Sequence, residues 1–154
     1  MESIKIITKN IMETKKSFAS NGFLYNPKKQ EVLLHLRDGH ATTNPNKWAF
    51  FGGAGEGGET AAECCSREIK EELNIDIPVE DLILLRDYLI PDYITEKRCE
   101  HQHSYYIESD IPKSEMILSE GADFDWVPLD KVFEYDMSDE TVESLKMFIE
   151  KIEE

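Results

Sequence analysis

The sequence predicts an α+β fold in which a mixed β-sheet lies between helices. Strand-like segments dominate the 154 residues, two amphipathic helices are clear, and these helices do not alternate regularly with the strands. Regular alternation would favour a doubly wound parallel sheet, whereas the observed order favours a mixed sandwich. No internal repeat, low-complexity segment or linker divides the chain, so we expect a single domain over residues 1–154.

The first third of the chain predicts a hairpin followed by a third strand. Residues 1–16 show no clear period and suit a short strand or an irregular arm. The segments Ser17–Tyr25 and Glu31–Arg37 predict two strands, because turn-forming residues 26–29 separate two largely apolar runs. The aromatic segment Lys47–Phe51 then predicts a short strand that runs into two glycines.

A helix is predicted over Ala61–Leu73 by its start, its apolar spacing and its end. Thr60 and Glu63 match a capping box, in which each residue satisfies a backbone N–H of the other. Asn74 is a suitable end, because asparagine tolerates the left-handed backbone conformation better than most residues. Helical spacing gives this segment one buried face, formed by Ala62, Cys65, Ile69 and Leu73.

The remainder predicts three more strands and a C-terminal helix. The strands are expected over Leu82–Ile90, Cys99–Glu108 and Asp123–Val127. Leu129–Phe133 suits one helical turn, and the last helix is expected over Thr141–Ile152. Its expected N-cap is Ser138, and its expected apolar face consists of Val142, Leu145, Phe148 and Ile152.

The net charge of −15 argues against nonspecific binding to nucleic acids or to anionic membranes, which requires clustered Lys and Arg. A small phosphorylated substrate stays compatible with this charge if a metal ion bridges the two negative partners. For most of the carboxylates, solubility is the simpler explanation. No apolar run approaches the ~20 residues of a membrane span, and no signal-peptide core is recognisable, so we expect a cytoplasmic protein with no membrane contact.

Three cysteines, Cys64, Cys65 and Cys99, form no C-x-x-C motif and no paired framework. An odd number of cysteines fits a reducing compartment. Cys64 and Cys65 lie inside the predicted helix, where cysteine behaves as a small apolar residue. A nucleophilic cysteine is the weaker alternative.

Three glutamates of the predicted helix form an acidic stripe. Glu68, Glu71 and Glu72 are spaced i, i+3 and i+4, which places their carboxylates on one side of a helix. Like charges at this spacing destabilise an isolated helix by a few tenths of a kcal/mol per pair. Neighbouring carboxylates are the oxygen ligands that Mg²⁺ or Mn²⁺ prefers, so the stripe predicts a divalent-metal site. A merely solvated acidic face would explain these glutamates, but not the glycines and the arginine at fixed spacings around them.

The stretch reads as G-x5-E-x7-R-E-U-x-E-E-x-x-U, where U is a bulky apolar residue. The matching positions are Gly53, Glu59, Arg67, Glu68, Ile69, Glu71, Glu72 and Ile75. This pattern resembles the Nudix box, the signature of the Nudix (MutT-like) hydrolases. The family carries glycine where this chain has Asn74, a mild departure that lies beyond the carboxylates. Segments around Trp48, before the double glycine, and Glu120–Trp126 are also similar to those of many members.

The resemblance implies a Nudix-type α/β/α sandwich and a metal-dependent activity. Members cleave the pyrophosphate bond of a nucleoside diphosphate linked to another moiety, with Mg²⁺ or Mn²⁺. The implied metal ligands are the Gly53 carbonyl, Glu68, Glu71 and Glu72, and the implied supporting residues are Glu59 and Arg67. Arg67 can pair with Glu59, or with Glu63 and Glu71 one helical turn away.

The general base varies within the family. Glu68 and Glu120 are the candidates here, because Glu120 matches the position of a distal metal-binding glutamate in MutT-like members. A solvated loop acid is an equally good interpretation of Glu120. Dimerisation is common in the family, so a homodimer stays open.

Several residues are candidates for contact with a small phosphorylated nucleotide. Gly52 would let the backbone approach the phosphates. Trp48, Tyr105, Tyr106 and Trp126 could stack on a base, or could be core residues. Arg37 and Arg86 could bind a phosphate, or could form surface salt bridges.

Two histidines, His101 and His103, would point to the same side of a strand. Together with Glu100 they could form a second metal site, and His103 could instead line the substrate cleft. Ordinary surface histidines are the simplest interpretation of both. His35, inside a predicted strand, suits a structural role.

The substrate is left open by the sequence. The options are a nucleoside triphosphate, a nucleotide sugar, ADP-ribose and a dinucleoside polyphosphate. MutT itself uses an asparagine near the start of its last helix to read an oxidised purine, and no asparagine follows Asn74 here; Thr141 occupies that region. A Nudix-fold module that senses a nucleotide without hydrolysis is the alternative function, although such modules usually have degenerate boxes.

Overall fold

The structure is a computed structural model that describes residues 18–41, 44–90 and 100–154. The short strand or irregular arm expected over residues 1–16 therefore lies outside the described residues. The strands are β1 Phe18–Asn26, β2 Glu31–Leu36, β3 Trp48–Ala49, β4 Phe51–Ala54, β5 Ile83–Ile90, β6 Glu100–Glu108 and β7 Asp123–Pro128. The helices are α2 Ala61–Leu73 and α4 Asp139–Ile152, with short 3-10 segments at Val79–Asp81, Lys113–Glu115 and Leu129–Glu134.

All of these strands join one mixed sheet. Its main path runs β3-β2-β1-β6-β5, while β4 also pairs with β1 and β7 with β2. β1 and β6 pair in parallel, and the other pairs are antiparallel. The long central strand β1 is buried along most of its length, which explains its small and apolar residues.

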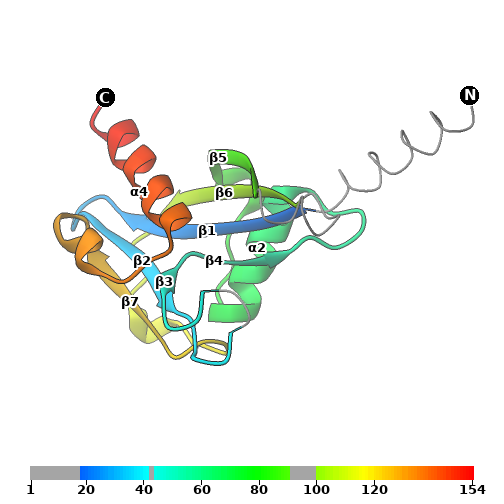
Figure 1. The fold of residues 1–154 in the computed structure, drawn as a ribbon, viewed down its shortest axis with the longest axis horizontal. Helices are drawn as coiled ribbons and strands as arrows, with labels where there is room; N and C mark the ends of the chain where they lie inside the picture. The colour runs from blue at the N-terminus through cyan, green and yellow to red at the C-terminus, as the bar shows by residue number, and fades with distance from the viewer. Residues whose placement is uncertain (1–17, 42–43, 91–99) are drawn as a thin grey trace, which may run out of the picture.

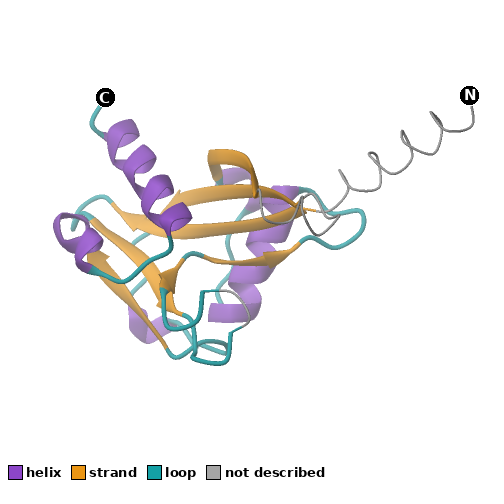
Figure 2. Ribbon diagram, viewed as in Figure 1, coloured by secondary structure: helices purple, strands orange, loops and turns teal. Residues whose placement is uncertain are grey.

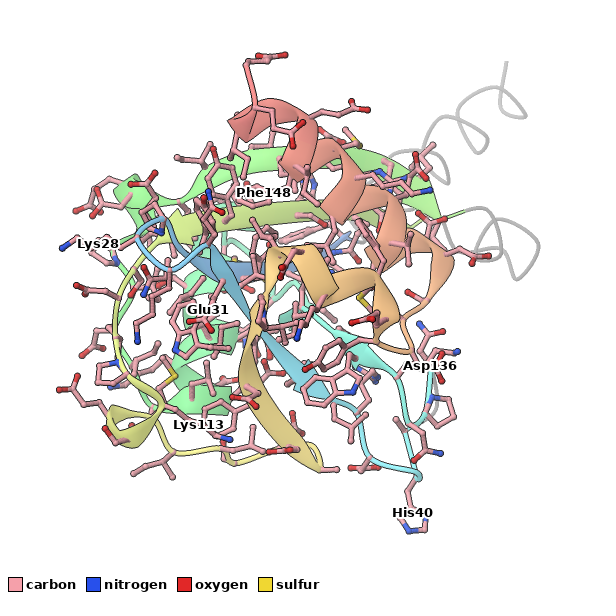
Figure 3. The ribbon with its side chains drawn as sticks, turned by 90° about the vertical axis from the view of Figure 1, so that its left-hand side faces the viewer. Lys28, Glu31, His40, Lys113, Asp136 and Phe148 are labelled. Atoms are coloured by element: carbon pink, nitrogen blue, oxygen red, sulfur yellow. The ribbon has the colours of Figure 1, made fainter. Side chains whose placement is uncertain are left out.

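The two long helices cover opposite faces of this sheet (Figures 1 and 2). Alternate residues of β1 serve the two cores: Phe23 belongs to the cluster under α4, and Leu24 to the cluster under α2. Phe148 of α4 lies against the sheet and meets the ring of Phe23 edge-on, with centroids 5.0 Å apart (Figure 3). The predicted mixed sheet between helices is therefore confirmed.

Most predicted elements are confirmed to within one or two residues. α2 has the predicted bounds and a complete capping box between Thr60 and Glu63. Asn74 ends it in the left-handed conformation, with φ 57°. Ser138 is the N-cap of α4, and this helix begins at Asp139, two residues before the predicted start, because the cap directly precedes it.

The prediction of one strand over Lys47–Phe51 is wrong. Two short strands replace it, because the chain changes partner at Phe50: β3 pairs with β2, and β4 pairs with β1. Phe50 is buried on the α4 side and Phe51 on the α2 side. As a result, the two glycines lie inside β4. Among the described residues, no helix is both long and apolar enough to cross a bilayer.

Candidate active site

The acidic stripe of α2, formed by Glu68, Glu71 and Glu72, lies beside β4. Small residues on β1 and β4 let the helix approach the sheet closely. The Ser20 hydroxyl of β1 donates a hydrogen bond of 2.7 Å to the carbonyl of Ala61, which holds the start of the helix over β1. On β4, a Cβ at Gly53 would lie 2.6 Å from Oε1 of Glu68. Only glycine therefore leaves room for the Glu68 carboxylate at its present position beside the β4 backbone.

Arg67 connects the carboxylates of this region. Its Nε and Nη2 donate to the two oxygens of Glu59, at 3.1 and 2.8 Å, and its Nη1 donates to Glu68 at 3.0 Å and to Glu71 at 3.2 Å. Nη2 also donates to the carbonyl of Ala54 at 3.1 Å. Of the three glutamates that were expected to pair with Arg67, Glu59 and Glu71 do so. The Glu63 side chain instead accepts the backbone N–H of Thr60 in the capping box.

The Arg67 hydrogen bonds lower the pKa of Glu59 from 4.5 to about 2, so this carboxylate is ionised throughout the physiological range. The same carboxylates raise the pKa of Arg67. Arg67 and Glu59 thus form a fixed ion pair at the base of the acidic stripe, positioned to orient Glu68 and Glu71.

Glu72 differs from the other glutamates, because only 4% of it is exposed and its Oε2 has no hydrogen-bond partner. Burial, followed by the charges of Glu68 and Glu120, raises its pKa from 4.5 to about 8, although a backbone hydrogen bond from Gly52 opposes this shift. Burial also raises the pKa of Glu68. Glu71, with 56% of its side chain exposed, lies at the solvent side of the stripe.

Glu120 reaches the same place from a distant part of the sequence. The backbone N–H of Ser119 donates to the carbonyl of Glu72 at 2.9 Å, and the Ser119 hydroxyl contacts the carbonyl of Glu71. These bonds fasten the loop to the end of α2. Gly121, with φ 94°, then turns the chain towards β7, and a Cβ there would lie 2.9 Å from the carbonyl of Leu36. The charge of Glu120 accordingly acts on both Glu68 and Glu72.

The donor set fits a divalent cation. The charges of Glu68 and Glu120 act on the buried Glu72 carboxylate, and a buried carboxylate oxygen without a partner is costly unless a cation or a proton satisfies it. Hard carboxylate oxygens are the ligands that Mg²⁺ and Mn²⁺ prefer. A cation beside the Glu72 carboxylate would also have the charges of Glu68 and Glu120 close by.

The predicted substrate-contact residues are spread over both faces of the sheet. Arg37 lies close enough to the glutamates for its charge to act on Glu72. Tyr105 is on the α2 face and packs against that core. Trp48 packs instead against the core under α4, where its ring meets Tyr135 edge-on. The geometry therefore groups Arg37, Gly52 and Tyr105 on the α2 side and places Trp48 on the other.

The other three candidates for substrate contact, Tyr106, Trp126 and Arg86, make contacts within the fold. Tyr106 is buried in the core under α4, which removes it as a base-stacking residue. Trp126 is half-buried in the core under α2 and donates its indole N–H to the carbonyl of Ile111. Arg86 pairs with Glu140 of α4 at 3.0 Å, which is the salt-bridge alternative rather than phosphate binding.

The two described cysteines, Cys64 and Cys65, are buried. Burial raises the pKa of both thiols, that of Cys64 from 9.0 to about 12. Because the thiolate is the nucleophilic form, the alternative of a nucleophilic cysteine at these positions loses its basis. Cys99 lies outside the described residues.

One of the two remaining histidine environments agrees with the sequence, and the other was not visible in it. His35 is buried, stacks on Phe51, and has a pKa lowered from 6.5 to about 4, chiefly by burial; this agrees with a structural role. Asp87 of β5 lies beside His101 and His103 of β6. Only the cross-strand register of β5 and β6 could have indicated that neighbour. The Glu100 side chain, the third residue of the predicted cluster, lies outside the described part.

Comparison with known proteins agrees with this geometry. The family model described as NUDIX domain matches residues 16–148. The chain belongs to the Nudix family. The resemblance inferred from the glycine, glutamate and arginine pattern is thereby confirmed, and Nudix proteins generally use a divalent metal ion.

Similar structures share the fold of this Nudix chain. The MutT protein from Methanosarcina mazei Go1 has a TM-score of 0.71 and 19% identity, covering 89% of this chain and 95% of that protein. The Escherichia coli dihydroneopterin triphosphate pyrophosphohydrolase has a TM-score of 0.64 and 18% identity, covering 87% and 95%. The NUDIX domain of Shewanella oneidensis NrtR, complexed with ADP ribose, has a TM-score of 0.67 and 16% identity, covering 88% and 86%.

A curated relative matches more closely over a shorter region. The dihydroneopterin triphosphate diphosphatase of Escherichia coli K12 is 39% identical over 57 residues, which is 37% of this chain. The match spans 35% of the length of that relative.

Proposed function

We propose that this Nudix protein is a pyrophosphohydrolase that requires Mg²⁺ or Mn²⁺ and acts on a nucleoside diphosphate linked to another moiety. Water adds across the P–O–P bridge, and the products are a nucleoside monophosphate and either pyrophosphate or a phosphorylated moiety. The observation that carries the proposal is the buried carboxylate of Glu72, whose Oε2 has no partner beside Glu68 and Glu120. A cation held there compensates all three carboxylates and gives a chain of net charge −15 a contact for a polyanionic substrate.

Each residue of the site has a separate role in this proposal. Glu68, Glu71, Glu72 and the Gly53 carbonyl hold the ion, and Arg67 with Glu59 keeps Glu68 and Glu71 in place. When bound, the ion supplies neutralisation of the diphosphate and a lower pKa for a coordinated water. Glu68 or Glu120 accepts the proton of the attacking water, since the charges of both carboxylates act on Glu72 and so lie near the ion. Gly52 and Arg37 border the same place and contact the phosphates.

The substrate class is supported by the relatives rather than by a shaped pocket. A triphosphate such as dihydroneopterin triphosphate is favoured by the curated relative, whose aligned region has 39% identity. ADP-ribose is the second option, because a structurally similar NUDIX domain was solved in complex with it. Nucleotide sugars and dinucleoside polyphosphates complete the set to be tested.

A non-catalytic nucleotide-sensing module is the second candidate function. The similarity to a NUDIX domain complexed with ADP ribose supports it. Against it stands the complete set of charged positions in the box: Glu59, Arg67, Glu68, Glu71 and Glu72. The proposed hydrolysis uses all of these groups, whereas nucleotide binding alone would not require them.

A substrate panel separates the two candidates. Dihydroneopterin triphosphate, nucleoside triphosphates, ADP-ribose, a nucleotide sugar and a dinucleoside polyphosphate are incubated with the protein, with and without Mg²⁺ or Mn²⁺. Anion-exchange chromatography then measures the released monophosphates. We expect metal-dependent turnover of at least one compound, and a strong loss of it in Glu71→Gln and Glu72→Gln.

The matched control is Glu143→Gln, because Glu143 is an exposed glutamate of α4 on the other side of the sheet. This variant should keep the wild-type rate. ADP-ribose binding without turnover of any compound would favour the sensing module. Turnover that survives both α2 substitutions would contradict the site assignment while leaving the activity in place.

A further inference from the structure

A second group of side chains of the types that bind metal ions lies on β5 and β6, where β5 forms the edge of the sheet (Figure 1). His101 and His103 are two residues apart on β6 and therefore point to the same face. Asp87 on β5 is the cross-strand partner of His103. The antiparallel register thus brings two imidazoles and one carboxylate together from two neighbouring strands.

The three side chains face one another closely. His101 Nε2 contacts Asp87 Oδ1, and His103 Nδ1 lies 4.0 Å from Asp87 Oδ2. The two imidazole rings are nearly parallel, with centroids 4.3 Å apart. One ligand atom from each of the three residues lies within 4.8 Å of the others. In a tetrahedral zinc site with Zn–N distances of ~2.0–2.1 Å, ligand atoms are roughly 3.3 Å apart, so small side-chain rotations suffice for binding.

This group is separate from the glutamate site. Asp87, His103, Ser20 and Gly53 form one row of partners across four strands, β5, β6, β1 and β4. His103 is therefore two strand spacings, or about 10 Å, from Gly53. The Phe18 ring packs beside His103, which it meets edge-on, and it occupies the space that a Cβ at Gly55 would need. One ion cannot bridge both groups.

We propose that Asp87, His101 and His103 bind a transition-metal ion of the zinc class, distinct from the Mg²⁺ or Mn²⁺ of the glutamate site. Imidazole nitrogens suit Zn²⁺, whereas Mg²⁺ prefers an all-oxygen set. The side chains are 46%, 38% and 18% exposed for Asp87, His101 and His103, so solvent reaches the group and water can provide the fourth ligand. A common cation would satisfy both stacked imidazoles and the shared carboxylate at once, whereas protonation of both rings would place two like charges beside each other.

The simpler alternative is an ion pair between Asp87 and His101, with His103 as a neighbour. That arrangement needs no metal and gives no selective affinity for Zn²⁺. Selective binding that depends on both histidines therefore distinguishes the proposal from the ion pair.

The test titrates Zn²⁺ into the metal-free protein against a chelating dye, in excess Mg²⁺ so that the glutamate site is already filled. We expect one Zn²⁺ per chain in the wild type and at least a roughly tenfold weaker affinity in His101→Ala/His103→Ala and in Asp87→Asn. The matched control is His40→Ala, because His40 projects from an exposed turn far from β5 and β6 (Figure 3). This control should bind Zn²⁺ like the wild type.

Imidazole ¹⁵N NMR of the wild-type protein gives a second reading that does not depend on how the variants fold. Zn²⁺ should shift the ring signals of His101 and His103 and leave that of His40 unchanged. Unshifted His101 and His103 rings would overturn the proposal. So would a Zn²⁺ affinity that is the same in the double-histidine variant as in the wild type, or one that is lost in Glu72→Gln instead. None of these readouts depends on the proposed hydrolase activity.

Discussion

Arg67 holds Glu59 through a forked pair of hydrogen bonds, from Nε to Oε2 at 3.1 Å and from Nη2 to Oε1 at 2.8 Å. The remaining nitrogen, Nη1, is directed to Glu68 and Glu71, which follow Arg67 on α2. Because one guanidinium connects an anchored carboxylate to two proposed metal ligands, its planar shape matters as well as its charge.

Replacing Arg67 by lysine should therefore impair the enzyme although the charge is kept. An ammonium group cannot form the fork to Glu59 and reach Glu68 at the same time. We expect kcat/KM to fall by roughly 10- to 100-fold, with a weaker apparent affinity for Mn²⁺. The control is Arg86→Lys, which alters a comparable guanidinium pair with Glu140 on the α4 side and should leave kcat/KM unchanged. Equal kinetics for the two variants would contradict a positioning role for Arg67.

Gly53→Ala should separate metal binding from stability. The added Cβ would lie 2.6 Å from Oε1 of Glu68, so the end of this side chain must move. Because a flexible side chain gives way, we expect the free energy of unfolding to change by less than about 1 kcal/mol, while Mn²⁺ affinity falls by roughly tenfold or more. Gly57→Ala is the matched control, since a Cβ there meets nothing within 4 Å. Identical Mn²⁺ titrations of the two alanine variants would argue against Glu68 as a ligand.

Glu120→Gln tests the loop that follows Ser119. If Glu120 holds the ion or accepts the proton, its loss should lower kcat by roughly 10²- to 10⁴-fold with little change in fold. Ser119→Ala is a useful comparison, because it keeps the backbone bond to the Glu72 carbonyl and should lose far less activity. Wild-type kcat in Glu120→Gln would make Glu120 a solvated loop acid and leave Glu68 as the base.

The pKa of Glu72 predicts an unusual pH dependence of stability. In a chelator, a folded-state pKa of about 8 against an ordinary 4.5 means that the folded protein holds its proton more tightly than the unfolded chain does. This contribution is fully present below pH 4.5 and is lost as the pH rises to about 8. Glu59 acts in the opposite sense: its pKa of about 2 contributes stability above pH 4.5 that is lost as the pH falls towards 2.

Thermal unfolding of wild type and Glu72→Gln measures this effect as a difference, so that other titrating groups cancel. In chelator, the Tm of the wild type should fall relative to that of the variant between pH 4.5 and 8. Adding Mg²⁺ at pH 8 should then raise the wild-type Tm more than that of the variant, because only the wild type gains a full ligand set. Parallel Tm curves across this range would contradict the burial of Glu72 beside like charges.

Local patterns allowed most of the fold to be predicted. Thr60 with Glu63, and Asn74 after Leu73, mark the ends of α2 because capping depends on neighbouring residues alone. The break at Phe50 was not predicted, since a change of strand partner is decided by tertiary pairing. The same reason hid the neighbourhood of Asp87 and His103, which are joined only by the register of β5 and β6.

The candidate site shows the same division. Glycine and glutamate spacings indicated which residues surround the ion, and Arg67 was expected to pair with Glu59 or Glu71. The differences among the glutamates were not predictable, because burial of Glu72 and exposure of Glu71 depend on how α2 sits against β4 and the Ser119 loop. For the same reason, the sequence could not place Trp48 on the α4 side of the sheet.

The central claim is that the buried Glu72 carboxylate is completed by a divalent cation. Electron paramagnetic resonance of free Mn²⁺, titrated with wild type, Glu72→Gln and Glu143→Gln, tests it most directly. We predict a site in the wild type and in Glu143→Gln that is weakened at least roughly tenfold in Glu72→Gln. The same Mn²⁺ affinity and stoichiometry in all three proteins would contradict the claim.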